Sequence, residues 1–65
     1  MNKIWYAVML DKEDSDWGTG SRNLDEALSR AREYRTNGYA DAYVAVIEEG
    51  DYDAVCVDEI HDLDA

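Results

Sequence analysis

The segment KIWYAVML, residues 3–10, most constrains the fold, because it reads as a β-strand with no polar side. Side chains alternate between the two faces of a strand, so Ile4 and Trp5 point to opposite sides and both are apolar. Both faces of this strand therefore need to be covered. A chain of 65 residues forms one small domain, which has little material for two covering layers.

The stretch from about residue 24 to residue 37 predicts the helix of this domain. Asn23 is a favourable N-cap residue, and Glu26 stands three positions later in a capping-box arrangement. Gly38 suits the left-handed position that often ends a helix. The apolar residues at helical spacing form a single stripe, made of Leu24, Ala27, Leu28, Ala31 and Tyr34. This stripe can cover one face of a sheet.

Two further strands are predicted over about residues 42–48 and 53–60, with Gly50-Asp51 as a two-residue turn between them. That turn would place Val44 opposite Val57 and Val46 opposite Val55. Residues 17–21 are a candidate short strand, which leaves ββαββ and βαββ open. The predicted fold class is α+β, with a single helix on one face of a three- or four-stranded, mainly antiparallel sheet. Residues 60–65 are expected to form a frayed acidic tail of this single domain.

One helix leaves the second face of this sheet without cover. Apolar patches beyond a few hundred Å² are unusual on soluble monomers and often mark an interface. We therefore expect another chain to cover this face, and a second copy in a two-fold homodimer is the commonest arrangement. The residues predicted to make this apolar contact are Trp5, Tyr43, Ile47 and Tyr52.

The charge of the chain indicates a second kind of partner. The chain has 16 acidic residues against six basic ones, and its net charge is −10. This field repels nucleic-acid phosphates and anionic lipids, so no direct binding to nucleic acid or membrane is expected. A basic protein is the expected partner, and the chain could act on it as a nucleic-acid mimic or inhibitor. The carboxylates predicted to meet it are Asp51, Asp53 and Asp58; the alternative is a solvated strand edge that prevents aggregation.

Chemistry of other kinds has little support in the sequence. The lone His61 and the lone Cys56 do not form a nucleophile–base pair or a zinc site, so neither an enzyme nor a cofactor is predicted. An alternative function is cation binding by the acidic turn over residues 11–16, through Asp11, Asp14 and Asp16. A cytoplasmic location is expected, because a lone cysteine permits no intrachain disulfide and no leader or membrane-spanning run is visible.

The sequence SRNLDEAL, residues 21–28, follows an acidic hairpin and resembles the strand-to-helix passage of HicB-type antitoxins. That resemblance implies a small acidic regulator that binds a partner protein, although Trp17-Gly18-Thr19-Gly20 replaces the loop that precedes the helix in that family. The whole chain resembles small, acidic, uncharacterised proteins of bacteria and phages, particularly of Firmicutes, which implies no activity. The sequence as a whole predicts a non-enzymatic protein–protein interaction module, and the alternatives are a cation-binding protein and an antitoxin-like regulator.

Overall fold

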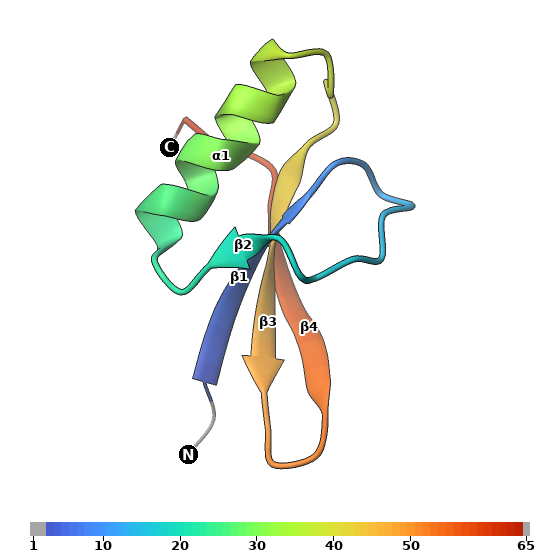
Figure 1. The fold of residues 1–65 in the computed structure, drawn as a ribbon, viewed down its shortest axis with the longest axis vertical. Helices are drawn as coiled ribbons and strands as arrows, with labels where there is room; N and C mark the ends of the chain where they lie inside the picture. Colours follow the sequence, from blue (N-terminus) through green and yellow to red (C-terminus); the bar gives the residue numbers. More distant parts are fainter. Residues whose placement is uncertain (1–2, 65) are drawn as a thin grey trace.

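The computed structural model describes residues 3–64, which form one helix and four strands in the order ββαββ (Figure 1). The elements are β1 (Lys3–Met9), β2 (Gly20–Ser21), α1 (Leu24–Thr36), β3 (Tyr43–Glu49) and β4 (Ala54–Ile60). The strands make one antiparallel sheet in the order β2-β1-β3-β4. The predicted α+β class is therefore confirmed. Within the described residues, no helix is long and apolar enough to cross a membrane.

Local signals set both ends of α1. The Asn23 side chain accepts a hydrogen bond from the Glu26 backbone N–H at 3.2 Å, as the N-cap prediction requires. The capping box closes through a third residue: Ser21 Oγ accepts from the Asn23 N–H at 2.9 Å and donates to Glu26 Oε2 at 2.6 Å. At the other end Gly38 has a φ of 109°, which favours glycine over other residues.

β1 lies at the centre of the sheet and pairs along its whole length with β3, from Lys3 opposite Glu49 to Met9 opposite Tyr43. On its other side β1 pairs with the two residues of β2. Gly20 is needed there, because a Cβ atom on it would lie 2.1 Å from the backbone oxygen of Tyr6. The candidate strand over residues 17–21 is thus reduced to its last two residues.

The β3–β4 hairpin corrects the predicted register. Val55 lies opposite Glu48, and Val44 lies opposite Ile60, so the expected pairs of valines do not form. The turn sits one residue later than expected, because the Gly50 N–H donates to the Asp53 carbonyl at 2.7 Å and closes the hairpin. A bulge between Val46 and Ile47 then shifts the pairing by one more residue.

Two apolar clusters flank the sheet, and α1 covers only one of them. On the helix side the buried residues are Val8, Ala27, Ala31, Val44 and Leu63. Leu63 is 1% exposed, so the expectation of a frayed tail over residues 60–65 is wrong for this part; Ala65 lies outside the described residues. Arg32 and Arg35 hold this segment in place, because they donate to the backbone oxygens of Leu63 and His61 at 2.5 and 2.7 Å.

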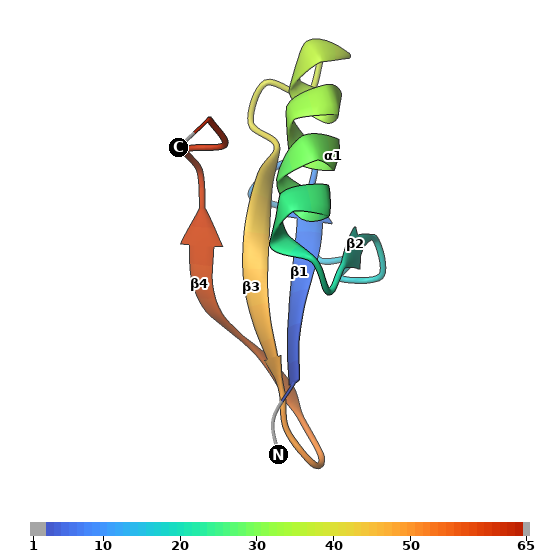
Figure 2. The same ribbon diagram turned by 90° about the vertical axis from the view of Figure 1, so that its left-hand side faces the viewer.

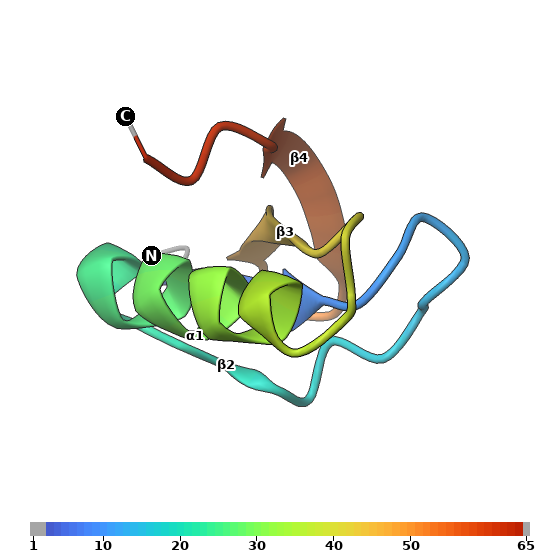
Figure 3. The same ribbon diagram turned by 90° about the horizontal axis from the view of Figure 1, so that it is seen from above.

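The second face of the sheet is covered by the chain itself, which overturns the premise of an uncovered apolar face. Its buried residues are Ala7, Met9, Tyr43, Ala45 and Ile47, and Trp5 and Trp17 pack against them. Trp17 comes from the loop between β1 and β2, which lies on the opposite side of the sheet from α1 (Figure 3). The Trp5 indole N–H donates to the Trp17 carbonyl at 2.7 Å and fixes the loop over this face. A ten-residue loop with one large indole thus covers the face for which the sequence predicted a partner chain.

Candidate protein-interaction surface

The most exposed apolar side chains of the sheet lie on β4 and on the turn that precedes it. Tyr52 at the turn is 98% exposed, and Val55 and Val57 on β4 are 51% and 53% exposed. Three exposed aspartates share this region. We call this region the β4 surface, and it consists of Asp51, Tyr52, Asp53, Val55, Val57 and Asp58.

The helix leaves the β4 surface open. The Cα atoms of α1 come within 8 Å of β1, β2 and β3, but not of β4. β4 stands apart from the helix, and the hairpin extends beyond it (Figures 1 and 2). Val55 lies on the helix side of the sheet because it pairs with Glu48, two residues along β3 from Val46. Its side chain therefore points into space that α1 would fill if it extended further over the sheet.

The aspartates of the β4 surface have no basic partner. The two ion pairs found within residues 3–64 are Arg22–Glu49, at 3.1 Å, and His61–Glu59, at 3.0 Å, the second being charged when His61 is protonated. Three of the six basic residues donate hydrogen bonds to backbone carbonyls elsewhere in the chain. Arg22 donates to Ile4, Arg32 donates to Leu63, and Arg35 donates to Ala42 and His61. The negative charge of the β4 surface is therefore uncompensated by neighbouring side chains.

The structure divides the residues that the sequence grouped as an apolar interface. Ile47 and Tyr43 are 1% and 5% exposed and belong to the core of the chain, while Trp5 is half-buried beside Trp17. Only Tyr52 is fully accessible, and it lies between the predicted acidic residues Asp51 and Asp53.

Sequence reasoning missed Val55 and Val57 as surface residues. The predicted pairing with Val44 and Val46 puts both valines on the helix side of the sheet, and the structure confirms this side for Val55. A helix of 13 residues that packs on β1, β2 and β3 does not reach the edge strand. The one signal available was the position of β4 as the last strand of a sheet with a single covering helix.

The acidic turn uses its carboxylates within the loop. Asp14 accepts from the backbone N–H groups of Leu10 and Asp16, both at 3.0 Å. Asp11 accepts from the Glu13 N–H at 2.9 Å, and Asp16 accepts from the Gly18 N–H at 2.8 Å. Nowhere in residues 3–64 do three His, Cys, Asp or Glu side chains gather in a way that could hold a metal ion. These hydrogen bonds give the carboxylates a structural role in the loop that carries Trp17, and cation binding stays a prediction.

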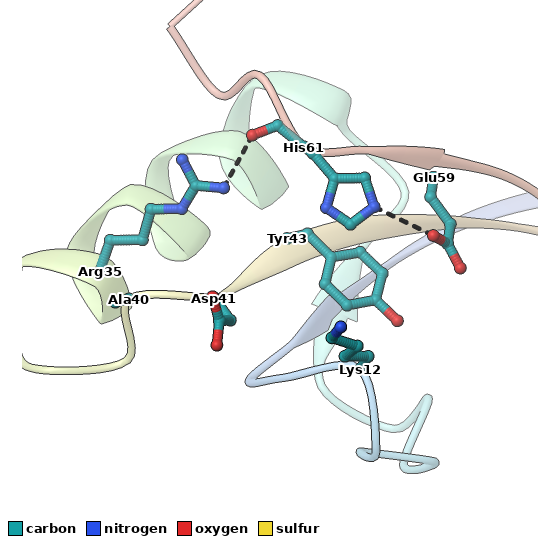
Figure 4. Close-up of a pocket in the computed structure, with 7 residues that line it drawn as sticks. All are labelled: Lys12, Arg35, Ala40, Asp41, Tyr43, Glu59 and His61. Carbon is teal, nitrogen blue, oxygen red and sulfur yellow. Dashed lines mark hydrogen bonds and ion pairs between the residues drawn. The ribbon is translucent and has the colours of Figure 1, made fainter.

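A cavity of about 400 Å³ lies beside the end of β4 (Figure 4). The His61 ring stacks on Tyr43, with 4.6 Å between ring centroids, and His61 Nε2 lies 3.0 Å from Glu59 Oε1. Burial, followed by the nearby Glu59 carboxylate, raises the pKa of Tyr43 above its ordinary value of 10.0. The described lining residues are Lys12, Arg35, Ala40, Asp41, Tyr43, Glu59 and His61. None of these residues is a serine, threonine or cysteine that could act as a nucleophile. Charges of both signs meet here, so this cavity favours no ligand of one sign.

No protein-family model, no curated protein and no solved structure matches this chain. The function of this chain is therefore inferred from its own residues. The resemblance of residues 21–28 to HicB-type antitoxins stays a prediction.

Proposed function

We propose that this protein is a non-enzymatic, cytoplasmic interaction module that binds a basic protein partner through the β4 surface. The observation that carries the proposal is the combination of uncompensated carboxylates and half-exposed valines on a strand that α1 does not cover. Such a mixture is suited to a specific interface, in which apolar contacts supply affinity while charge selects the partner and accelerates its approach.

The kind of partner follows from the charge of this region. From Asp41 to the end of the chain there are nine acidic residues and no lysine or arginine. A display of carboxylates along an extended strand repeats negative charge at a spacing of about 6.8 Å on each face. A protein groove that ordinarily holds nucleic acid would meet complementary charge here, so inhibition of such a protein by mimicry is part of the proposal.

The structure offers less apolar surface for self-association than expected from the sequence. The expected homodimer depended on an open second face, and Tyr43 and Ile47 on that face are buried within the chain. A homodimer therefore stays a prediction without its original argument. Light scattering behind a sizing column tests it directly, since one chain has a mass of 7.4 kDa.

The test of the proposed function compares two variants with the same change of charge. The first is Asp51→Asn/Asp53→Asn/Asp58→Asn, which neutralises the β4 surface. The control is Asp25→Asn/Asp41→Asn/Asp64→Asn, which removes three exposed carboxylates from other parts of the chain. Each protein is used to capture partners from a lysate of the cells that make it, at low and at high salt, and retained proteins are identified by mass spectrometry.

We expect a basic protein to be retained at low salt by the wild type and by the control variant. The β4 variant should lose it, and so should the wild type at high salt, because salt screens exposed charges. Equal retention by both variants, or retention of no basic protein, would overturn the proposal.

A further inference from the structure

We propose that the outer edge of β4 takes up an extended segment of the basic partner as a fifth strand of the sheet. The segment would present apolar side chains to Val55 and Val57 and basic side chains to Asp53 and Asp58. This inference rests on the proposed function and specifies how the β4 surface holds its partner.

The hydrogen bonding of the hairpin shows which backbone groups of β4 point outward. β4 is the last strand of the sheet, so one of its edges has no neighbouring strand. Gly50 and Asp53 form a hydrogen-bonded pair, with 2.7 Å between the Gly50 nitrogen and the Asp53 oxygen. Paired residues of antiparallel strands alternate between bonded and non-bonded positions, so Ala54 and Cys56 direct their N–H and C=O groups away from β3. These groups are the ones that an added strand would pair with.

The far end of this edge is closed to pairing. Val57 is the extra residue of the bulge, since Cys56 pairs with Ile47 while Asp58 pairs with Val46. The Asp58 side chain accepts a hydrogen bond from the Glu59 N–H at 2.8 Å, and the Cys56 thiol donates to the Asp58 carbonyl at 3.3 Å. The chain thus satisfies its own backbone groups beyond the bulge, which limits the added strand to a short segment beside residues 53–57.

The side chains of β4 define what the segment must carry. Asp53 and Val55 lie on the helix side of the sheet, because their partners Gly50 and Glu48 are on that side, and Asp58 lies there too, opposite Val46. Val57 is the extra residue of the bulge and comes between Val55 and Asp58 along the strand. Along the strand, the exposed side chains of Asp53, Val55, Val57 and Asp58 therefore follow the order acid, valine, valine, acid. A segment that places two apolar residues between two basic ones matches this order.

Charge argues against a second copy of this chain as the occupant. An antiparallel two-fold pairing centred on Cys56 would set Asp53 opposite Glu59 in both halves of the dimer. Like charges directly opposite each other on neighbouring strands are destabilising, and each chain carries a net charge of −10. A basic segment in the same place converts each of these repulsions into an attraction.

The experiment uses the intact protein and a short capped peptide, the alternating peptide, of sequence Lys-Ser-Val-Ser-Val-Ser-Lys. Serine alternates with the other residues, so one face of the extended peptide carries two valines between two lysines. The first control is a peptide of the same composition with the lysines grouped at one end. The second control is the alternating peptide with methyl groups on alternate backbone nitrogens, on the edge that would face β4. This peptide keeps the charge and the side chains, but its methylated nitrogens cannot donate hydrogen bonds to β4. Binding is measured by calorimetry, and amide hydrogen exchange of the protein is followed by NMR.

We expect the alternating peptide to bind about tenfold more tightly than either control, which corresponds to one well-made hydrogen bond or more. It should also slow amide exchange at Ala54 and Cys56 by about tenfold, because a strand neighbour protects outward N–H groups. The Val57→Lys variant, which adds a positive charge at an exposed position, should weaken binding of the alternating peptide.

Equal binding of the methylated peptide, or unchanged exchange at Ala54 and Cys56, would overturn the strand addition, as would no binding at all. The capture experiment on the aspartate variants decides the proposed function separately. A partner lost only by the β4 variant, together with unprotected amides in the peptide experiment, would mean that the surface binds a basic protein by another geometry.

Discussion

Replacing Leu63 by alanine measures how much of the fold depends on the last residues of the chain. Leu63 is 1% exposed and packs with Val8, Ala31 and Val44 on the helix side of the sheet. Truncating a buried leucine costs about 2–5 kcal/mol, and a site near a chain end can collapse around the cavity, so we expect about 2–3 kcal/mol. The total stability of a domain of this size is about 3–10 kcal/mol, so the variant should lose a large part of it.

Urea unfolding followed by tryptophan fluorescence gives the comparison. With an m-value of about 1 kcal/mol/M, the midpoint of the Leu63→Ala variant should fall by about 2–3 M at unchanged m. Val57→Ala serves as the control, because Val57 is 53% exposed and its truncation should change the free energy of unfolding by less than about 1 kcal/mol. Equal midpoints for the two variants would refute the docking of Leu63 and restore the frayed tail.

Two further predictions concern the second face of the sheet. Trp17→Ala should lower the free energy of unfolding by about 2–3 kcal/mol, since the indole is only partly buried, and should increase binding of an apolar dye to the uncovered face; an unchanged midpoint would contradict its covering role. The raised pKa of Tyr43 makes stability depend on alkaline pH. The stabilisation linked to this raised pKa is fully present below pH 10.0 and is lost as the pH rises through the raised pKa. The reason is that Tyr43 in the unfolded chain gives up its hydroxyl proton at a lower pH than Tyr43 in the folded chain. Urea unfolding between pH 8 and pH 11 should therefore show a smaller loss for Tyr43→Phe than for the wild type, and parallel losses would argue against burial of a neutral Tyr43.

The helix and the strands were predictable because their signals are local. Asn23 and Gly38 mark the two ends of α1, and Ala27 and Ala31 of the predicted stripe are buried in the structure. The strands followed from runs of apolar residues between turn residues. Each of these assignments depends on residues within a few positions of one another, so tertiary contacts were not needed to make them.

The register of the β3–β4 hairpin was not predictable from the same pattern. Side chains repeat every two residues along a strand, so a shift of two residues keeps each side chain on its face. The alternation around Val55 is therefore equally compatible with Val46 and with Glu48 as its partner. The position of the turn, fixed by the Gly50–Asp53 hydrogen bond, and the bulge after Cys56 decide between them.

The cover of the second face was beyond sequence reasoning for a different reason. Loops show no periodicity, so nothing in the pattern around Trp17 indicates which surface the indole meets. Its placement depends on a non-local hydrogen bond from Trp5 and on the loop geometry that Asp14 stabilises. The expectation of a partner chain on this face assumed that only helices and strands cover a sheet, and the loop that carries Trp17 removes that assumption.

The arrangement of charges favours a recognition role for the β4 surface over solubility alone. Solubility requires only net charge, and carboxylates paired with arginines would leave that net charge the same. Here Arg32 and Arg35 instead hold backbone carbonyls of the C-terminal segment, and Arg22 binds Glu49 on β3. These three arginines stabilise the fold at sites away from the β4 surface, and the aspartates of that surface have no basic partner at an edge that repels its own copy. An edge protected against self-pairing in this way is still open to a strand of opposite charge.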